Sequence, residues 1–518
     1  MYIYNLGGKF KSVAAGNPDA CALICENGKT TYQQLDSYSD SFADYLISAG
    51  VNPGELICIA GDKSPQTIAC IIGTLKAGVT YSVFDSESPI ARLEKIFQRC
   101  NPSLIICDSS LRAGIEETGY KTVDRESIDF DRPVQNKLQL HRLLQSTASN
   151  SPAYVMFTSG STGFPKGATM THQNVLNLIE WSVDTYSFIS TDVLTSVNPL
   201  YFDNSVFDLY SSLFSGASLA LFDGATVRDP RKLMHLIDEF GCTSWFSVPS
   251  MLIYLQTMRA LRPESFRHIR RIIFGGEGYP KAKLKELFDI FSDRVSFYNV
   301  YGPTECTCIC SSYSVQKGDF VDLKGFLPLG ELAKNFGGLI VDEELRTVNP
   351  GESGELILRG PNVGLGYYRD PERTAAAFIQ NPEHDSFPDI VYRTGDLVYL
   401  NQEDGKIWIT GRADNQIKHM GYRIELEEIE NALNCIEAVA QNAVIHCEIR
   451  GLSQLVAFVK AKDAECEEDL LRRRLSELIP QYMIPTKFQF LNQLPKNANG
   501  KLDRKQLKAG YLGQLVNE

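Results

Sequence analysis

Residues 158–167 combine hydroxyl side chains, glycines and a lysine in the order Thr-Ser-Gly-Ser-Thr-Gly-Phe-Pro-Lys-Gly. They follow the apolar residues 154–157 (Tyr-Val-Met-Phe), which predict a buried strand. Glycines let backbone N–H groups approach phosphate oxygens closely, the hydroxyl groups add donors, and Lys166 adds a positive charge. The segment is not a Walker loop, because no Gly-Lys-Ser/Thr follows at the required spacing. Two interpretations remain, a polyphosphate-binding loop and an ordinary flexible loop of similar composition.

A second group of reactive side chains lies at Cys306, Cys308 and Cys310. On a strand, a spacing of two places all three thiols on one face. No second cysteine pair and no nearby histidines complete a zinc-ligand pattern, so we expect no metal there. The thirteen cysteines of the chain follow no repeating frame and are typical of reduced cytosolic thiols.

The overall charge argues against two classes of partner. The chain has 518 residues, 43% of them hydrophobic and 22% charged, with a formal net charge of −12 and no long basic run. Nucleic acid and anionic membrane surfaces are therefore not expected partners. The N-terminus has no apolar signal region, and the apolar run 67–75 is far shorter than a membrane span of about 20 residues. We expect a cytoplasmic protein.

Alternating apolar and amphipathic stretches indicate the elements that must position these residues. Short apolar or β-branched runs are separated by helical spacing, as in residues 31–49 and 280–291, and the runs that predict strands are 55–60, 103–107, 153–157, 218–221, 271–274 and 355–358. This pattern predicts α/β architecture with mostly parallel sheets in a large N-terminal domain. At Gly411 the sequence becomes turn-rich, and an amphipathic helix is expected near Glu425.

The expected division is therefore a large domain, residues 1–413, and a small mobile α+β domain, residues 414–518. The boundary at Asp414 is interpreted as a hinge, although a surface turn has the same local composition.

The phosphate-loop motif resembles that of the adenylate-forming superfamily, which includes acyl-CoA synthetases, luciferases and the adenylation domains of nonribosomal peptide synthetases. The resemblance continues along almost the whole chain. The matching motifs are LKAG from Leu75, YFDNSV from Tyr201, NVYGPTE from Asn299, GEL from Gly354, GLGY from Gly364, YRTGD from Tyr392, GRADNQIK from Gly411, GYRIE from Gly421 and NGKLD from Asn499. The sequences of these motifs resemble those of amino-acid-activating members, in particular stand-alone adenylation domains and D-alanine:carrier-protein ligases. The segment 79–82, Val-Thr-Tyr-Ser, departs from the usual Gly-Ala-Tyr at a structural position.

The resemblance implies a two-step reaction with ATP and Mg²⁺. A carboxylate attacks the α-phosphate of ATP to give an acyl-adenylate and pyrophosphate, and a thiol then takes the acyl group. The matching motifs imply that Lys501 bridges the carboxylate and the α-phosphate, that Thr304 donates to the α-phosphate, and that Glu305 binds Mg²⁺. The same motifs imply nucleotide contacts from Thr158, Ser159, Gly160, Ser161, Thr162, Gly163, Lys166, Gly275, Gly276, Glu277, Asn299, Tyr301, Asp396 and Arg412.

The substrate is expected to be an amino acid, because Asp203 matches the aspartate that pairs with the α-ammonium in amino-acid activators. A buried carboxylate without such a partner would be costly. The remaining wall implied by the resemblance is Asn204, Phe207, Phe246, Ile273, Gly275, Val300, Cys308 and Ile309. None of these could pair with a charged side chain and two are bulky, so a small apolar amino acid the size of proline, alanine or valine is expected. Each wall residue could equally be ordinary core.

The chain ends soon after Lys501, so a separate carrier protein bearing phosphopantetheine is the expected acceptor. We also expect a monomer. In relatives the small domain rotates about the residue matching Asp414 between the two half-reactions. Three alternative functions are a D-alanine:carrier-protein ligase, an acyl-CoA synthetase, which Asp203 disfavours, and a catalytically silent scaffold. The scaffold is disfavoured because the phosphate loop, Glu305 and Lys501 are all present.

Overall fold

The computed structural model describes residues 4–60, 63–160, 162–449, 452–462, 466–495 and 502–516. The chain divides into two compact units. Unit 1 comprises Met1–Asp85, Cys100–Phe157 and Gly167–Ala413, and unit 2 comprises Ser86–Arg99, Thr158–Lys166 and Asp414–Glu518. The phosphate loop and one helix from the first hundred residues therefore group with the C-terminal residues. The division into a large domain and a mobile small domain hinged at Asp414 stays a prediction.

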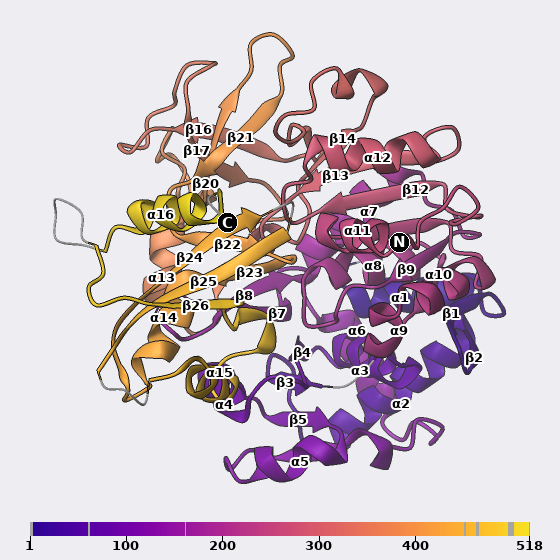
Figure 1. Ribbon diagram of the computed structural model, residues 1–518. Coiled ribbons are helices and arrows are strands. Elements are labelled where there is room, and N and C mark those ends of the chain that lie inside the picture. The colour runs from indigo at the N-terminus through magenta and orange to yellow at the C-terminus, as the bar shows by residue number, and fades with distance from the viewer. Residues whose placement is uncertain are drawn as a thin grey trace. The chain divides into compact units, whose positions relative to one another are not determined.

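Two α/β sheets dominate unit 1 (Figure 1). The nine-stranded sheet has the order β15-β14-β13-β12-β11-β9-β10-β1-β2, and its pairs from β1 through β13 are parallel. Its strands are β1 (Cys21–Cys25), β2 (Gly28–Thr31), β9 (Val193–Ser196), β10 (Ser218–Leu221), β11 (Ser244–Ser247), β12 (Arg271–Gly275), β13 (Ser296–Tyr301), β14 (Ser311–Ser314) and β15 (Glu331–Leu332).

The seven-stranded sheet has the order β18-β8-β7-β4-β3-β5-β6. Its strands are β3 (Leu56–Ile59), β4 (Thr80–Val83), β5 (Leu104–Cys107), β6 (Thr122–Asp124), β7 (Pro152–Thr158), β8 (Lys166–Thr171) and β18 (Gly366–Tyr367). The pairs from β7 to β6 are parallel. The predicted strands 55–60, 103–107, 153–157, 218–221 and 271–274 thus all form within the two α/β sheets, as expected from their apolar runs.

A third sheet in unit 1 differs from the prediction because it is antiparallel throughout. It contains the predicted strand at 355–358, and its members are β16 (Gly337–Val341), β17 (Gly354–Arg359), β19 (Phe378–Gln380), β20 (Ile390–Leu400) and β21 (Ile407–Arg412). An apolar run indicates a strand but not the direction of its neighbour. Short connections in this region, such as residues 401–406 between β20 and β21, return the chain alongside the same strand.

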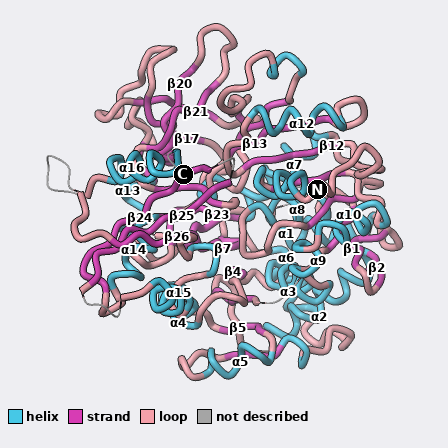
Figure 2. The backbone as a smooth tube through the Cα atoms, viewed as in Figure 1, coloured by secondary structure: helices cyan, strands magenta, loops and turns pink. Residues whose placement is uncertain are grey.

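Most helices of unit 1 bury apolar side chains, whereas the last of them has no buried residue. They are α1 (Leu6–Gly16), α2 (Tyr32–Ser48), α3 (Pro65–Lys76), α5 (Ser109–Glu116), α6 (Lys137–Ser146), α7 (His172–Tyr186), α8 (Asn204–Leu213), α9 (Gly224–Arg228), α10 (Pro230–Glu239), α11 (Pro249–Thr257), α12 (Lys281–Phe291) and α13 (Pro371–Ala377). The predicted helix at 31–49 begins with a capping box at Thr31, whose hydroxyl accepts the Gln34 N–H. Figure 2 shows α12 beside β12 and β13, where Leu284 and Leu287 join the strands in one core cluster.

Short 3-10 helices occupy several connections: Arg125–Ser127, Thr304–Cys306 and Lys317–Phe320 in unit 1, and Gln481–Met483 in unit 2. The second of these replaces the strand on which the three cysteines would have shared a face. Thr307 and Cys308 follow it with φ of 63° and 70°, so the segment 306–310 is turned rather than extended.

Unit 2 contains a three-stranded sheet and a hairpin (Figure 1). The sheet order is β24-β25-β26, from β24 (Val439–Ile449), β25 (Leu452–Ala461) and β26 (Lys487–Phe490), and the hairpin joins β22 (Gln416–His419) to β23 (Tyr422–Glu425). Its helices are α4 (Ile90–Cys100), whose last residue belongs to unit 1, α14 (Leu426–Asn434), α15 (Glu468–Ser476) and α16 (Arg504–Val516). The helix expected near Glu425 is therefore α14.

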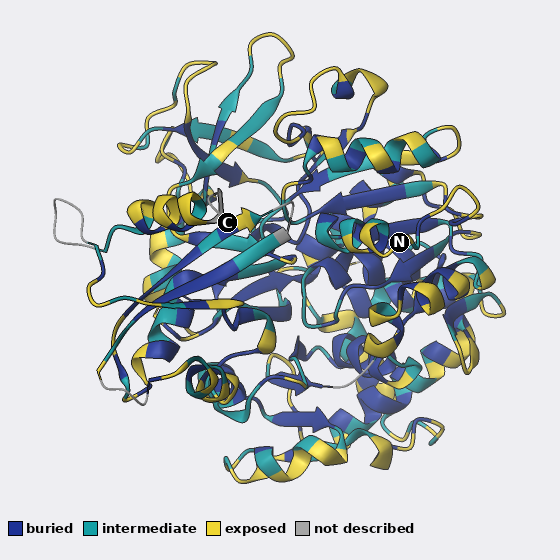
Figure 3. Ribbon diagram, viewed as in Figure 1, coloured by how far each residue is buried: buried dark blue, intermediate teal, exposed yellow. Residues whose placement is uncertain are grey.

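Burial follows the pattern of an α/β protein. The central strands of the α/β sheets are buried on both faces, whereas helices such as α12 bury one side only (Figure 3). In the described ranges, no helix is both long and apolar enough to cross a membrane.

Candidate functional site

The phosphate loop of unit 2 is shaped by two glycines. A Cβ on Gly160 would lie 2.0 Å from the carbonyl oxygen of Phe164, so only glycine fits there. Gly163 has a φ of +79° and donates its N–H to the carbonyl of Gly160 at 2.9 Å. The loop is therefore a tight turn that brings main-chain groups close together.

Residues at the end of β23 and the start of α14 contact the hydrogen-bond donors of this loop. All of these residues belong to unit 2. The Lys166 ammonium lies 2.9 Å from a carboxylate oxygen of Glu425, and the N–H of Gly160 donates to Glu428 at 3.2 Å. The hydroxyl of Ser159 donates to the carbonyl of Arg423 at 2.7 Å and accepts the N–H of Glu425 at 2.9 Å. Two carboxylates thus contact groups that the sequence assigned to phosphate.

Helix α4 supports both partners. Arg92 forms a buried ion pair with Glu428, and Lys95 donates to the carbonyl of Gly163 at 3.2 Å. The Lys95 ammonium also lies 5.6 Å from the centroid of the Phe164 ring. The hydroxyl of Thr158 is buried without a hydrogen-bond partner in the described part of the chain. Ser161, predicted to contact the nucleotide, lies outside the described residues.

In unit 1, the predicted ribose-binding residue Asp396 is buried and hydrogen-bonded on both oxygens. The hydroxyl of Tyr301 donates to one oxygen at 2.5 Å, and Arg412 contacts the other at 2.6 Å. Burial and the charge of Asp396 hold the pKa of Tyr301 well above its usual value, so the phenol stays protonated and keeps donating. The structure therefore brings three predicted nucleotide residues into one network, with Asp396 at its centre.

Glu305 and Thr304 lie in the 3-10 helix Thr304–Cys306. A carboxylate oxygen of Glu305, which is fully buried, accepts the hydroxyl of Tyr367 at 2.7 Å. The hydroxyl of Thr304 donates to Asp203 at 2.6 Å, which joins a predicted catalytic residue to the predicted ammonium-binding residue. Tyr367 was missed by the sequence analysis, although it belongs to the GLGY motif.

The remaining predicted adenine contacts have structural partners. Glu277 accepts the N–H of Ser250 at 2.7 Å at the start of α11, and the amide of Asn299 donates to the carbonyl of Pro328 at 2.9 Å. Gly276 has a φ of +92°, a conformation that favours glycine. These contacts position the side chains but do not test their roles toward a nucleotide.

The predicted substrate wall is assembled from α8, β11, β12, β13 and the turn after the 3-10 helix. Phe207 and Phe246 pack edge to face with ring centroids 4.8 Å apart. Phe246 is in register with Ile273, and Gly275 with Val300. The apolar side chains of the wall belong to one buried cluster: Phe207, Phe246, Ile273, Val300, Cys308 and Ile309. The structure thus brings the predicted wall together, and its use as a binding surface stays a prediction.

Helix α8 also carries buried polar side chains. The amide nitrogen of Asn204 is buried and has no hydrogen-bond partner in the described ranges, while the thiol of Cys308 lies 3.9 Å from its amide oxygen. Asp208, one turn further along α8, accepts a hydrogen bond from Asn198 at 2.9 Å, and burial raises its pKa well above the usual value. Asp208 was missed by the sequence analysis, although its spacing of four from Asn204 places both on one helix face.

Two predicted functional residues give limited information. Lys501 lies outside the described residues. Asp414 accepts the N–H of Gln416 at 3.2 Å in unit 2, a local turn contact that leaves its role as a hinge a prediction.

In the described part of the chain, single carboxylates are the groups that could hold a metal ion. No group of three or more histidine, cysteine, aspartate or glutamate side chains suited to a metal is found among the described residues. A buried carboxylate such as Glu305 suits Mg²⁺, which commonly takes one or two protein carboxylates and completes its shell with phosphate oxygens and water.

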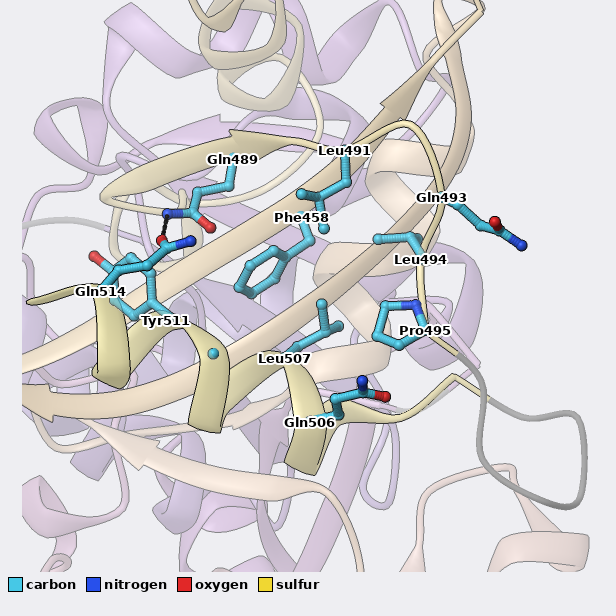
Figure 4. Close-up of a pocket in the computed structure, with 11 residues that line it drawn as sticks. Phe458, Gln489, Leu491, Gln493, Leu494, Pro495, Gln506, Leu507, Tyr511 and Gln514 are labelled. Carbon is cyan, nitrogen blue, oxygen red and sulfur yellow. Dashed lines mark hydrogen bonds between the residues drawn. The ribbon is translucent and has the colours of Figure 1, made fainter.

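A separate cavity of about 640 Å³ lies in unit 2 (Figure 4). Phe458, Leu507 and Tyr511 form its apolar side, and glutamines, two of which hydrogen-bond across it at 3.2 Å, lie on its rim. Its described lining residues carry no charge and include none of the predicted site residues. It offers no group that would bind an anion or activate a nucleophile.

Comparison with known proteins agrees with the predicted family. Residues 10–368 match the AMP-binding enzyme family, and residues 428–501 match the AMP-binding enzyme C-terminal domain. The chain is 30% identical to D-alanine--D-alanyl carrier protein ligase of Lacticaseibacillus rhamnosus, over 96% of this chain and 97% of the relative. It is 33% identical to a dimodular nonribosomal peptide synthase of Bacillus subtilis (strain 168), over 100% of this chain but only 21% of the synthase.

Solved structures show the same architecture. PA1221, a nonribosomal peptide synthetase protein with adenylation and carrier domains, solved with a vinylsulfonamide inhibitor, has a TM-score of 0.83 at 25% identity, covering 98% of this chain and 84% of that one. The adenylation domain AlmE of Vibrio cholerae, solved with glycyl-adenosine-5'-phosphate, has a TM-score of 0.83 at 23% identity, covering 100% of this chain and 99% of that one, and this likeness supports the fold alone. The large α/β and small α+β architecture predicted from the sequence is confirmed. The chain belongs to the AMP-binding enzymes and is an adenylating ligase.

Proposed function

We propose that this ligase activates a small apolar amino acid as an aminoacyl-adenylate and transfers it to the phosphopantetheine thiol of a separate carrier protein. The observation that carries the proposal is Asp203, a single carboxylate held by Thr304 beside a wall that is otherwise mostly apolar. An ammonium group complements this carboxylate, and the apolar wall offers no partner for a charged side chain.

In the first half-reaction, an oxygen of the substrate carboxylate forms a bond to the α-phosphorus of ATP. The bond from that phosphorus to the bridging oxygen breaks, and pyrophosphate leaves with the electron pair. Both reactants are anions, so cations and oriented donors must offset their repulsion. We assign this work to Lys501, Thr304 and Lys166, with Asp396 and Arg412 orienting the ribose.

We assign Mg²⁺ binding to Glu305. Mg²⁺ commonly binds one or two protein carboxylates together with substrate phosphates, and Glu305 offers one buried carboxylate. When bound, the ion would neutralise charge on the phosphates. The hydroxyl of Tyr367 donates to Glu305 and fixes the orientation of the carboxylate.

In the second half-reaction, the carrier thiol gives up its proton and its sulfur attacks the acyl carbon, so AMP leaves and a thioester forms. We assign the change between half-reactions to a rotation at Asp414. Asp414→Pro should reduce thioester formation about tenfold more than pyrophosphate exchange, because proline fixes φ and removes backbone freedom at this position. Equal loss of both activities would contradict the hinge.

The decisive experiment is ATP–pyrophosphate exchange with the twenty common amino acids and D-alanine. The proposal expects exchange with one or a few small apolar amino acids and little with charged ones. A pocket of this kind discriminates one methylene by only about 10–200-fold, so neighbouring substrates should show graded activity. Exchange with none of the panel, or equal exchange after Lys501→Ala, would contradict it.

A D-alanine:carrier-protein ligase is the second candidate. It is favoured by the end-to-end match to the Lacticaseibacillus enzyme, of which this chain covers 97%. Comparing D- with L-alanine in the same assay separates the candidates, since only this second function requires the D enantiomer. An acyl-CoA synthetase is less favoured because such an enzyme has no use for the carboxylate of Asp203.

We further propose that the chain acts as a monomer in the cytoplasm. The thirteen cysteines of the sequence follow no repeating frame, which suits a reducing compartment where ATP is also available.

A further inference from the structure

The phosphate loop of unit 2 contacts two carboxylates at the groups that would bind phosphate. Lys166 pairs with Glu425, and the N–H of Gly160 donates to Glu428. A carboxylate resembles part of a phosphate group in charge and in its acceptor oxygens, and it is bound by the same cations and main-chain donors. Glu425 and Glu428 lie three residues apart at the start of α14, so they present their charges as a pair.

We propose that Glu425 and Glu428 are positioning residues that compete with the nucleotide phosphates for this loop. The loop then alternates between two anionic occupants, the carboxylate pair and the pyrophosphate portion of ATP. This inference rests on the proposed function, because it assumes that the loop binds phosphate.

The contacts of Lys166 and Glu425 allow phosphate to replace the carboxylate, so the carboxylate need not occupy the loop permanently. The Lys166–Glu425 pair is largely buried, with side-chain exposures of 12% and 7%, so breaking it without a replacement would leave a poorly solvated charge. An incoming phosphate supplies that replacement for Lys166. Glu425 in turn keeps the amide of Gln416, which donates to the same oxygen at 2.7 Å. Neither charge is left alone when the occupants change.

Helix α4 explains why the carboxylate pair stays close to the loop. Arg92 pairs with Glu428 while Lys95, one turn later, holds the carbonyl of Gly163. The same helix therefore anchors both the competing anion and the loop. After pyrophosphate leaves, the two carboxylates would return to the loop and oppose its rebinding, which disfavours reversal of the first half-reaction.

The test measures the dissociation constant of inorganic pyrophosphate for the full chain by titration calorimetry. It also measures the KM values for ATP and for the amino acid in the exchange assay. When the competing state holds most of the population, the apparent dissociation constant rises by the reciprocal of the competent fraction. Glu425→Gln removes the charge but keeps an acceptor for Gln416. We expect this variant to bind pyrophosphate about three- to tenfold more tightly and to have a correspondingly lower KM for ATP, with the KM for the amino acid unchanged.

Glu427→Gln is the matched control. Glu427 lies between the two residues on α14 but contacts Asn415 and Arg504. This variant should bind pyrophosphate as the unaltered chain does. Glu428→Gln is a second probe whose fold must be checked by thermal melting, because it weakens the buried pair with Arg92. It should also tighten pyrophosphate binding if it melts near the unaltered chain.

Lys166→Ala separates failure of this inference from failure of the proposed function. If Lys166→Ala weakens pyrophosphate binding while Glu425→Gln leaves it unchanged or weaker, the competition is overturned and the phosphate loop stands. If the unaltered chain binds neither pyrophosphate nor ATP, both proposals fall. Equal tightening in Glu425→Gln and Glu427→Gln would also overturn the inference, since it would reflect general charge removal.

Discussion

The substrate wall in unit 1 and the phosphate loop in unit 2 are held in different ways. The wall is built from packed rings and strands, with Phe207 against Phe246 and Gly275 against Val300. The loop is held by ion pairs and hydrogen bonds to carboxylates. Packed interiors resist displacement, whereas a polar contact can be exchanged for another of like charge. Under the two proposals above, the wall selects the substrate by shape and the loop changes its occupant.

The largest expected effect concerns Asp203, the carboxylate that Thr304 contacts. Asp203→Ala should lower kcat/KM for the amino acid in pyrophosphate exchange about a hundredfold or more, because the ammonium of the proposed substrate would lose its charged partner at this half-buried position. Asp208→Asn is the control on the same helix. Its raised pKa already favours the neutral acid, so the neutral amide should change the rate only a few-fold. Full activity of Asp203→Ala would revive the acyl-CoA synthetase alternative.

A packed wall should also show coupled losses of stability and selectivity. Phe246→Ala is expected to cost about 3–5 kcal/mol in folding free energy and to admit larger side chains in the exchange assay. Phe297→Ala removes a ring from a different core cluster of unit 1 and should destabilise the fold without altering substrate range. Unaltered substrate range in a folded Phe246→Ala chain would show that this ring is ordinary core.

Acid should weaken the packed unit through a buried imidazole. His172 accepts the N–H of Leu6 at 3.1 Å, and burial lowers its pKa to about 4. The unfolded chain binds a proton near pH 6.5 while the folded chain does not, so stability falls as pH drops from about 6.5 to 4, by about 3 kcal/mol in total. His172→Gln should flatten this fall in melting temperature, whereas His141→Gln, at an exposed position, should not. An unchanged slope would contradict the assignment.

The smallest expected effect tests a polar contact within the packed unit. Tyr367→Phe removes the hydroxyl that donates to Glu305 and should reduce pyrophosphate exchange about tenfold at limiting Mg²⁺. Measuring the rate across Mg²⁺ concentrations shows whether the loss is in metal use. A rate equal to that of the unaltered chain at every concentration would mean that Glu305 needs no such orientation.

Local patterns in the sequence predicted most of the α/β elements. The apolar run 153–157 before the phosphate loop forms β7, and the stretch with helical spacing at 31–49 forms α2. The strand after the loop, β8, was not predicted. The antiparallel sheet was not predicted, because strand direction depends on how connections return and not on local periodicity. The turned conformation of Thr307 and Cys308 was also missed, since neither residue type favours positive φ.

The sequence motifs indicated candidate site residues, whose roles stay predictions, but they did not indicate which of these residues contact one another. The family motifs identify Asp203, Thr304 and Asp396, but no sequence pattern indicates that Thr304 donates to Asp203. The contact between Gly160 and Glu428 joins residues 268 positions apart. Such pairing depends on tertiary packing, and the local signal, two glutamates at the start of a helix, is also explained by favourable placement near the helix N-terminus.

Gly275 limits how this enzyme could be redesigned. A Cβ there would lie 2.2 Å from the carbonyl oxygen of Val300 on the neighbouring strand, so any larger residue would have to push β12 and β13 apart. The wall at Gly275 is made of main chain, so exchanging side chains cannot change its shape there. If the proposed wall binds the substrate, efforts to change substrate selectivity would therefore have to begin with the aromatic rings and Asn204.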